Sequence, residues 1–141
     1  DRRQRQICIR DRLRDFGNDL FENTGINFTS SGITEEFKDI LLSMNCKRHL
    51  IYIFKEGMNN ILKYSRCANV NLNFRLYDND LEIVLKDDGK GFDIYNCAKG
   101  YGLKNIYSRG KQIGVNVNIS SEENTGTVIN LSAKIPNLIL N

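Results

Sequence analysis

An acidic residue between a strand pattern and a glycine turn is the first candidate for chemistry. Residues 81–86 alternate apolar and polar side chains, as a half-buried strand does, and Asp87 continues this alternation on the apolar face. A carboxylate aimed at a core is costly unless hydrogen-bond donors reach it. Gly89 and Gly91 follow at once, where the backbone can turn sharply or let a ligand come close. We therefore expect a pocket whose ligand supplies the missing donor, as an adenine amino group would.

A polar row on a long helix pattern is the second candidate. At helical spacing, the apolar residues between about Cys46 and Ser65 cluster on one face, namely Ile51, Phe54, Met58, Ile61 and Leu62. Glu56, Asn60 and Lys63 cluster on the opposite face. The row fits a solvated helix face, and it also fits a metal–phosphate site. In such a site the amide oxygen would ligate magnesium, the lysine would meet phosphate charge, and the glutamate would orient or deprotonate a nucleophile.

Two glycine-containing segments complete the set of candidates. Gly100 and Gly102 precede a helix that begins at Leu103, and the N–H groups of a helix start can hold phosphate oxygens. An ordinary loop-to-helix turn would look the same. Thr127 follows Gly126 and shares the inner face of the last predicted strand. Its hydroxyl is either satisfied by backbone or helps Asp87 to bind a purine.

The elements that must position these residues follow from the periodicity of the chain. We predict helices at about Cys8–Glu22, Thr34–Met44, Cys46–Ser65 and Leu103–Ile113, with Asn45 as a break, and strands at Ile26–Thr29, 70–76, 81–87, 115–119 and 127–133, the last ended by Pro136. Asp78-Asn79-Asp80 is a turn, so the second and third strands form an antiparallel hairpin. The predicted fold class is an α+β sandwich, with helices on one face of a mixed, mostly antiparallel sheet.

Composition sets broad limits on function. The 141 residues fit one domain with a core, and 40% hydrophobic with 26% charged residues is ordinary for a globular protein. The net charge is +3, and the arginines of the first segment have no interleaved aromatic residues, which favours a solvated helix face over nucleic-acid binding. No signal peptide or membrane-spanning run is evident. Because the chain begins at Asp1, we expect it to be a piece of a longer protein.

The cysteines and the single histidine do not form a metal-site pattern. Cys8, Cys46, Cys67 and Cys97 include no CxxC pair, and scattered reduced thiols are expected. Cys46 and His49 form an isolated CxxH, and zinc would need two further ligands.

Taken in order, the four candidate segments resemble the motifs of the GHKL ATPase superfamily, which has the Bergerat fold. The N box corresponds to residues 54–65, the first glycine box to 87–91, the second to 100–106, and the last box to Gly126-Thr127. The match runs from about Phe16 to Pro136. Within the superfamily, the chain is similar to the catalytic and ATP-binding domain of bacterial sensor histidine kinases. The short distance between the glycine boxes resembles the subfamily that pairs with helix-turn-helix response regulators.

The resemblance implies roles for the N-box residues and for Asp87. Asn60 would hold Mg2+, and Glu56 would help to activate the phosphoacceptor histidine. Lys63 and Tyr64 would lie near the phosphates. Asp87 would accept a hydrogen bond from the adenine amino group.

The resemblance also implies roles for the residues of the glycine boxes. Gly89 and Gly91 would shape the adenine wall and the start of the lid. The backbone of Gly100 and Gly102 would hold phosphates with Leu103 beside them. Thr127 would support Asp87.

The implied function is transfer of the ATP γ-phosphoryl group to a histidine on a separate dimerisation domain, in two-component signalling. Residues 1–22 would be a leader helix linking to that upstream domain, and residues 23–141 would be the ATP-binding domain. His49 is expected to be structural. The implied partners are the upstream helices, a cognate response regulator and a second copy of the parent protein, with no direct nucleic acid. We expect a cytoplasmic domain, whose parent could be anchored in the inner membrane.

Two other functions remain open on the sequence. One is an ATP-gated interaction module without phosphotransfer, although Glu56 and Asn60 argue against it. The other is an anti-sigma-factor kinase that phosphorylates serine on a partner protein.

Overall fold

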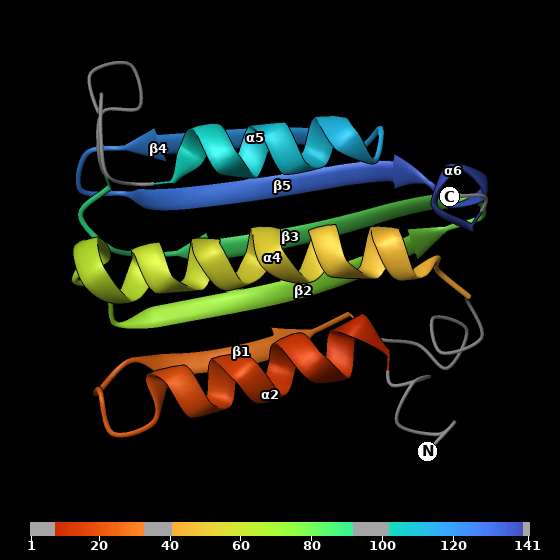
Figure 1. Ribbon diagram of the computed structural model, residues 1–141. Helices are drawn as coiled ribbons and strands as arrows, with labels where there is room; N and C mark the ends of the chain where they lie inside the picture. Colours follow the sequence, from red (N-terminus) through yellow and green to blue (C-terminus); the bar gives the residue numbers. More distant parts are fainter. Residues whose placement is uncertain (1–7, 33–40, 92–101, 140–141) are drawn as a thin grey trace.

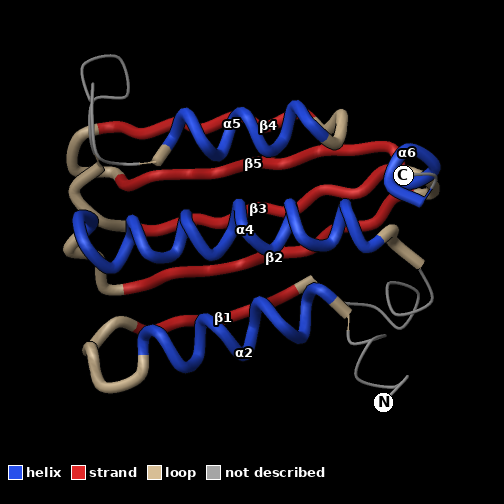
Figure 2. The backbone as a smooth tube through the Cα atoms, viewed as in Figure 1, coloured by secondary structure: helices blue, strands red, loops and turns tan. Residues whose placement is uncertain are grey.

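A computed structural model describes residues 8–32, 41–91 and 102–139. In this part of the chain, the longer helices lie on one face of a five-stranded sheet (Figures 1 and 2). The helices are α2 (Ile9–Phe21), α4 (Met44–Asn60), α5 (Leu103–Gln112) and the short α6 (Ile135–Ile139), and the π-helical turn η1 (Ile61–Ser65) continues α4. The strands are β1 (Asn27–Ser31), β2 (Asn69–Tyr77), β3 (Asp80–Asp87), β4 (Asn116–Glu122) and β5 (Gly126–Lys134). The predicted two-layer α+β fold is confirmed.

The sheet topology places β3 at its centre. The strand order is β1-β2-β3-β5-β4, with β1 and β2 parallel and the other neighbours antiparallel. The predicted hairpin of β2 and β3 is present, and Asp78 takes a left-handed conformation (φ 50°) in its turn. Because β3 has a neighbouring strand on both sides, its last residue lies at the centre of the row formed by the strand ends.

The inner face of the sheet is apolar, as the alternation predicts. Leu81, Ile83 and Leu85 of β3 are at most 1% exposed and lie under the helices with Leu50 and Phe54 of α4. On the other face, Asn, Thr and Ser side chains of β1 and β2 hydrogen-bond to one another across the strands. Strand parity therefore decides which side chains of each strand reach the helix layer.

The long helix begins earlier than predicted and changes character at its end. The Ser43 hydroxyl accepts a hydrogen bond from the Cys46 N–H (3.1 Å), so Asn45 lies in the first turn and the predicted break there is wrong. Leu62 is 37% exposed and does not continue the buried stripe as predicted. Leu62 lies in the π-helical turn, which contains more residues per turn than an α-helix, so its side chain is not where a count at α-helical spacing puts it.

Three other predictions concern the remaining segments. The helix predicted for Thr34–Met44 lies mostly outside the described residues. After β5, Pro136 sits in the first turn of α6, where its missing N–H needs no partner, and the sequence reading did not foresee this helix. Ile9 and Leu13 of α2 belong to the same core as the rest of the domain, while the link from residues 1–22 to an upstream domain stays a prediction.

We predict that Ser43→Ala lowers the free energy of unfolding by about 1 kcal/mol, because the cap of α4 loses its hydrogen bond. Urea unfolding at pH 7 measures this change. Ser108, exposed on α5, provides the control, and Ser108→Ala should not destabilise the domain. Equal stability of Ser43→Ala and wild type would contradict the assigned cap.

Candidate functional site

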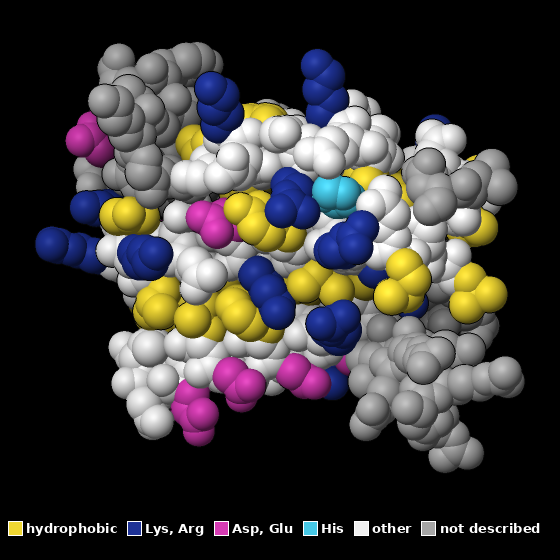
Figure 3. Space-filling view, viewed as in Figure 1, with side chains coloured by type: hydrophobic (Ala, Val, Ile, Leu, Met, Phe, Trp, Pro, Cys, Tyr) yellow, Lys and Arg dark blue, Asp and Glu magenta, His cyan; other side chains and the backbone are white. Residues whose placement is uncertain are grey.

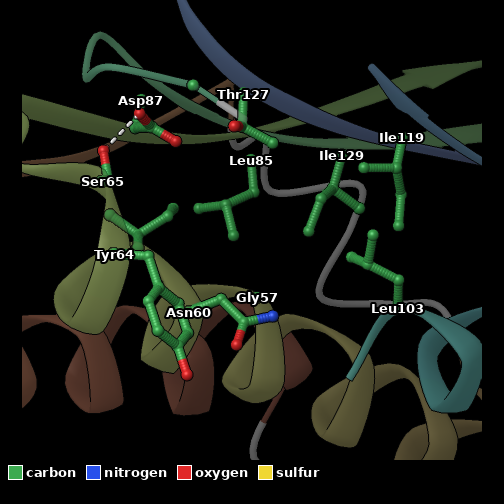
Figure 4. A pocket seen from close by; sticks show the side chains of 12 residues that line it. Gly57, Asn60, Tyr64, Ser65, Leu85, Asp87, Leu103, Ile119, Thr127 and Ile129 are labelled. Atoms are coloured by element: carbon green, nitrogen blue, oxygen red, sulfur yellow. Dashed lines mark hydrogen bonds between the residues drawn. The ribbon is translucent and has the colours of Figure 1, made fainter. Parts of the chain in front are cut away.

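A pocket opens between the end of the long helix and one edge of the sheet (Figure 4). The residues that line it come from α4, η1, β3, β4, β5 and the start of α5, and they are Gly57, Asn60, Ile61, Tyr64, Ser65, Leu85, Asp87, Gly91, Leu103, Ile119, Thr127 and Ile129. Most of this surface is aliphatic, with a few polar groups among it. Such a lining is typical of a site for a small organic ligand.

The Asp87 carboxylate is the most deeply buried polar group of the pocket. Asp87 is 2% exposed, as its position in the strand alternation predicts. Its Oδ1 accepts hydrogen bonds from the Ser65 hydroxyl (2.6 Å) and the Gly89 N–H (2.8 Å). Its Oδ2 is buried and has no hydrogen-bond partner among the described residues. An unpartnered buried acceptor is costly, and a donor on a bound ligand would remove that cost.

The glycine turn after Asp87 wraps around the end of η1. A side chain at Gly89 would overlap the hydroxyl and the carbonyl of Ser65, so only glycine fits there without displacing that residue. The Lys90 N–H donates to the Ser65 carbonyl (2.8 Å), and the Lys90 carbonyl accepts from the Asn124 N–H (2.6 Å). The turn is thereby fixed to η1 on one side and to the β4–β5 turn on the other.

A second pair of hydroxyls lies beside Asp87 on the neighbouring strands. Thr127 of β5 points into the pocket (Figure 4), and its Oγ1 is 2.8 Å from Oγ of Ser121 on β4. The Ser121 hydroxyl also lies 3.4 Å from the Gly126 carbonyl. The inward direction predicted for Thr127 is confirmed, whereas the sequence reading did not consider Ser121.

The start of α5 closes the pocket near Glu56. Gly102 caps this helix with φ 65°, a conformation that favours glycine, and an added Cβ would meet the Glu56 carboxylate. Leu103, the first residue of α5, lines the pocket. An acid on α4 thus lies beside a helix N-terminus, where unpaired N–H groups are available.

Comparison with known proteins gives a consistent result. No family model matches the chain. It is 30% identical over 104 residues to the sensor protein VraS of Staphylococcus aureus (strain COL), an alignment that covers 73% of this chain and 30% of VraS. VraS of Staphylococcus epidermidis (strain ATCC 12228) is 29% identical over 104 residues, with the same shares of both chains. The chain therefore spans 30% of the length of these curated relatives.

Solved structures share the fold of this chain. The histidine kinase domain from the blue-light activated histidine kinase EL346 of Erythrobacter litoralis has a TM-score of 0.74 at 16% identity, covering 93% of this chain and 63% of that chain. The histidine kinase AdeS of Acinetobacter baumannii has a TM-score of 0.68 at 9% identity, covering 90% of this chain and 63% of that chain. The chain thus shares the fold of histidine kinase domains and is similar in sequence to sensor proteins over 73% of its length.

The pocket gathers most of the residues singled out from the sequence, namely Asn60, Tyr64, Asp87, Gly91, Leu103 and Thr127. Glu56 and Gly102 adjoin each other next to it, and Gly89 lies behind Asp87. Lys63 is exposed and is not among the lining residues. Gly100 lies outside the described residues.

Ser65 ends the segment that resembles the N box, and the sequence predicts no role for it. One signal could have found it. Pocket residues on the helix recur at Gly57, Asn60, Ile61 and Tyr64, and Ser65 follows in the same i, i+3, i+4 spacing.

Among the described helices, none is long and apolar enough to cross a membrane.

The single histidine, His49, lies on α4, faces α5 and is not among the residues that line the pocket. His49 is 7% exposed, and its Nδ1 is 3.4 Å from Nη1 of Arg109, which stacks over the Tyr52 ring at 4.1 Å. Burial, with Arg109 and Arg48 as smaller contributions, lowers the pKa of His49. Figure 3 shows the histidine among Lys and Arg side chains on the helix face.

We predict that protonation of His49 destabilises the domain in acid. Its folded pKa lies below the unfolded value of about 6.5, so its stability contribution is complete above that pH and is lost as the pH falls below it. Urea unfolding of wild type and His49→Gln at several pH values from neutral to mildly acidic measures the difference. The free energy of unfolding of wild type should fall more steeply than that of the variant. Parallel curves would show that His49 does not resist protonation.

Proposed function

We propose that this chain is the ATP-binding catalytic domain of a sensor histidine kinase. It transfers the γ-phosphoryl group of ATP to a histidine on a separate dimerisation domain. The observation that carries the proposal is Oδ2 of Asp87, a buried acceptor that has no partner in the described part of the chain and lies at the base of a largely apolar pocket.

The pocket has the chemistry that an adenine ring requires. The adenine 6-amino group would donate to Oδ2 of Asp87, with Thr127 supporting the contact. Leu85 and Ile129, which reach the same pocket from adjacent strands, would cover the faces of the ring. A base with a carbonyl in place of the amino group would set two acceptors against each other. The site therefore favours adenine on hydrogen bonding alone.

The phosphates would lie toward the start of α5. Backbone N–H groups at Gly102 and Leu103 offer an anion site at a helix N-terminus, and Gly100 would extend it. Tyr64 would stand beside the phosphates, and the exposed Lys63 would meet their charge from the rim. Gly89 and Gly91 would shape the adenine wall.

Asn60 would hold Mg2+, because its amide lines the pocket next to this helix start and magnesium prefers oxygen ligands. When bound, the ion neutralises charge on the phosphates. Glu56, beside Gly102, would orient the incoming histidine or accept its proton. These groups converge from α4 and α5 on one side of the pocket, as positioning-dominated phosphoryl transfer requires.

The remaining parts of the reaction lie on partner segments. His49 is buried between helices, which supports a phosphoacceptor outside this domain. Residues 1–22 would connect to upstream dimerisation helices, and the phosphoryl group would pass on to a cognate response regulator. The parent protein would be a homodimer and could be anchored in a membrane, as a sensor with an external input would be.

The direct test combines this domain with the histidine-bearing helices of its parent and γ-labelled ATP. We expect acid-labile phosphate on a histidine outside this chain and none on the domain alone. Acid-stable phosphoserine on a partner would instead indicate a serine kinase. Nucleotide binding with no transfer under any condition would indicate an ATP-gated interaction module.

We predict that Asp87→Asn weakens ADP binding by about 2–3 kcal/mol, or roughly 30- to 150-fold. An amide at this position has one donor and one acceptor. Either orientation of the amide sets its donor against the Gly89 N–H or against the adenine amine. Calorimetric titration measures the affinity, and Asp88→Asn, on the outer side of the strand end, is the matched control. Unchanged affinity in Asp87→Asn would remove Asp87 from the adenine site.

We predict that Asn60→Ala lowers the phosphotransfer rate by roughly 100-fold or more, because charge stabilisation of the reacting phosphates is lost. The domain should stay folded, as circular dichroism would show. The matched control is Asn59→Ala on the preceding helix position, which is not among the pocket residues. A wild-type rate in Asn60→Ala with an unchanged need for magnesium would assign the metal to other residues.

A further inference from the structure

We infer that Ser65 is the positioning residue that sets base selectivity in this pocket. Its hydroxyl holds one oxygen of Asp87, so that the other oxygen faces the ligand. The inference rests on the proposed function, because it concerns how the adenine contact of that function is made.

The two oxygens of Asp87 have unequal surroundings. Oδ1 receives both donors that reach the carboxylate, the Ser65 hydroxyl at 2.6 Å and the Gly89 N–H at 2.8 Å. Oδ2 is also buried and receives no donor from the residues that the structure describes. Terminal carboxylate torsions are broad, so nothing intrinsic to the side chain fixes the angle at which the carboxylate plane presents an oxygen to the pocket. The two donors on Oδ1 fix that angle.

Of the two donors, only Ser65 can be changed without rebuilding the turn. The Gly89 N–H belongs to the backbone, and a side chain at Gly89 would overlap Ser65 itself. The serine hydroxyl also makes the shorter of the two hydrogen bonds, and a bond to a charged acceptor is stronger than one between neutral groups. Ser65 therefore supplies the alterable part of the orientation of Asp87.

Ser65 is itself held in place by the end of the helix, by burial and by a backbone hydrogen bond. It ends η1, and Arg66 follows it in a left-handed conformation (φ 52°) that turns the chain away. Ser65 is 8% exposed, and its carbonyl accepts from the Lys90 N–H at 2.8 Å. Hydroxyl and carbonyl thus bind the two ends of the turn from Asp87 to Lys90. A donor held this firmly loses little freedom when it orients the carboxylate.

Selectivity for the base is the property that this arrangement controls. Without Ser65, the carboxylate plane could rotate so that neither oxygen is directed at the ligand. The contact to the 6-amino group would then weaken, while contacts to the ring faces and to the phosphates would not change. A residue that only supported folding would affect all nucleotides alike.

The experiment measures calorimetric affinities for ADP and for purine riboside 5′-diphosphate, the analogue that lacks the 6-amino group. In Ser65→Ala we expect ADP binding to weaken roughly 10-fold while binding of the analogue is unchanged. Ser65→Cys keeps a similar volume with a much weaker donor and should behave in the same way. Ser43→Ala is the control, because it removes a serine hydrogen bond at the opposite end of the same helix.

Each outcome decides between clear alternatives. If wild type prefers ADP and Ser65→Ala keeps the full preference, the inference is overturned and the proposed function stands. If wild type does not distinguish ADP from the analogue, the adenine contact and the inference fall together. Equal weakening of both ligands in both variants, or loss of the folded state in both by thermal unfolding, would make Ser65 a structural residue and overturn the inference.

Discussion

A buried carboxylate at the end of the central strand is the constraint around which this part of the domain is organised. β3 pairs with β2 and β5 along its length, so its last residue cannot move to relieve an unfavourable environment. Asp87 is therefore held on the apolar face with two hydrogen bonds to one oxygen. The surrounding segments must deliver those donors, because an unsatisfied buried charge would destabilise the fold.

The segments that meet at Asp87 are far apart in the sequence. η1 delivers a hydroxyl, the turn after β3 folds back to deliver an N–H, and Gly126 starts β5 against the Asp87 carbonyl with no room for a side chain. The same turn binds the β4–β5 turn through Lys90 and Asn124. The pocket is the space left among these segments. Its shape depends on contacts that also stabilise the fold.

The sequence could predict those features that depend on a fixed period. Strand alternation is set by the hydrogen-bond ladder, so the inward direction of Asp87 and Thr127 followed from counting. Helical spacing placed Asn60 and the buried positions as far as Ile61. Beyond that point the chain continues as a π-helical turn, and Leu62, which the count put in the buried stripe, is 37% exposed.

Contacts between distant segments could not be predicted in the same way. The hydrogen bond from Ser65 to Asp87 joins residues 22 positions apart, and its existence depends on where η1 ends against β3. The pairing of Ser121 with Thr127 depends likewise on the register of β4 and β5. The cap by Ser43 was missed because Asn45 also suits a helix boundary, and only the position of the helix axis decides between them.

Two adjacent acids show how strand geometry gives successive residues different surroundings. Asp88 is exposed, yet Oδ1 accepts from the N–H groups of Ala68 and Asn69, and Oδ2 accepts from the Asn69 side chain. These hydrogen bonds, led by the Asn69 side chain, lower the pKa of Asp88. The acid that water could have solvated is thus satisfied by the protein on both oxygens, and it ties β2 to the end of β3.

Asp87 has the reverse arrangement. It is removed from water, and one of its oxygens receives no donor from the described protein. A folded domain tolerates such a group only if the rest of the structure outweighs its cost, and a ligand that supplies the donor recovers that cost as binding energy. Because the two residues are neighbours, their different surroundings come from the change of face between successive strand positions. The alternation of faces along β3 therefore decides which of the two acids faces the pocket.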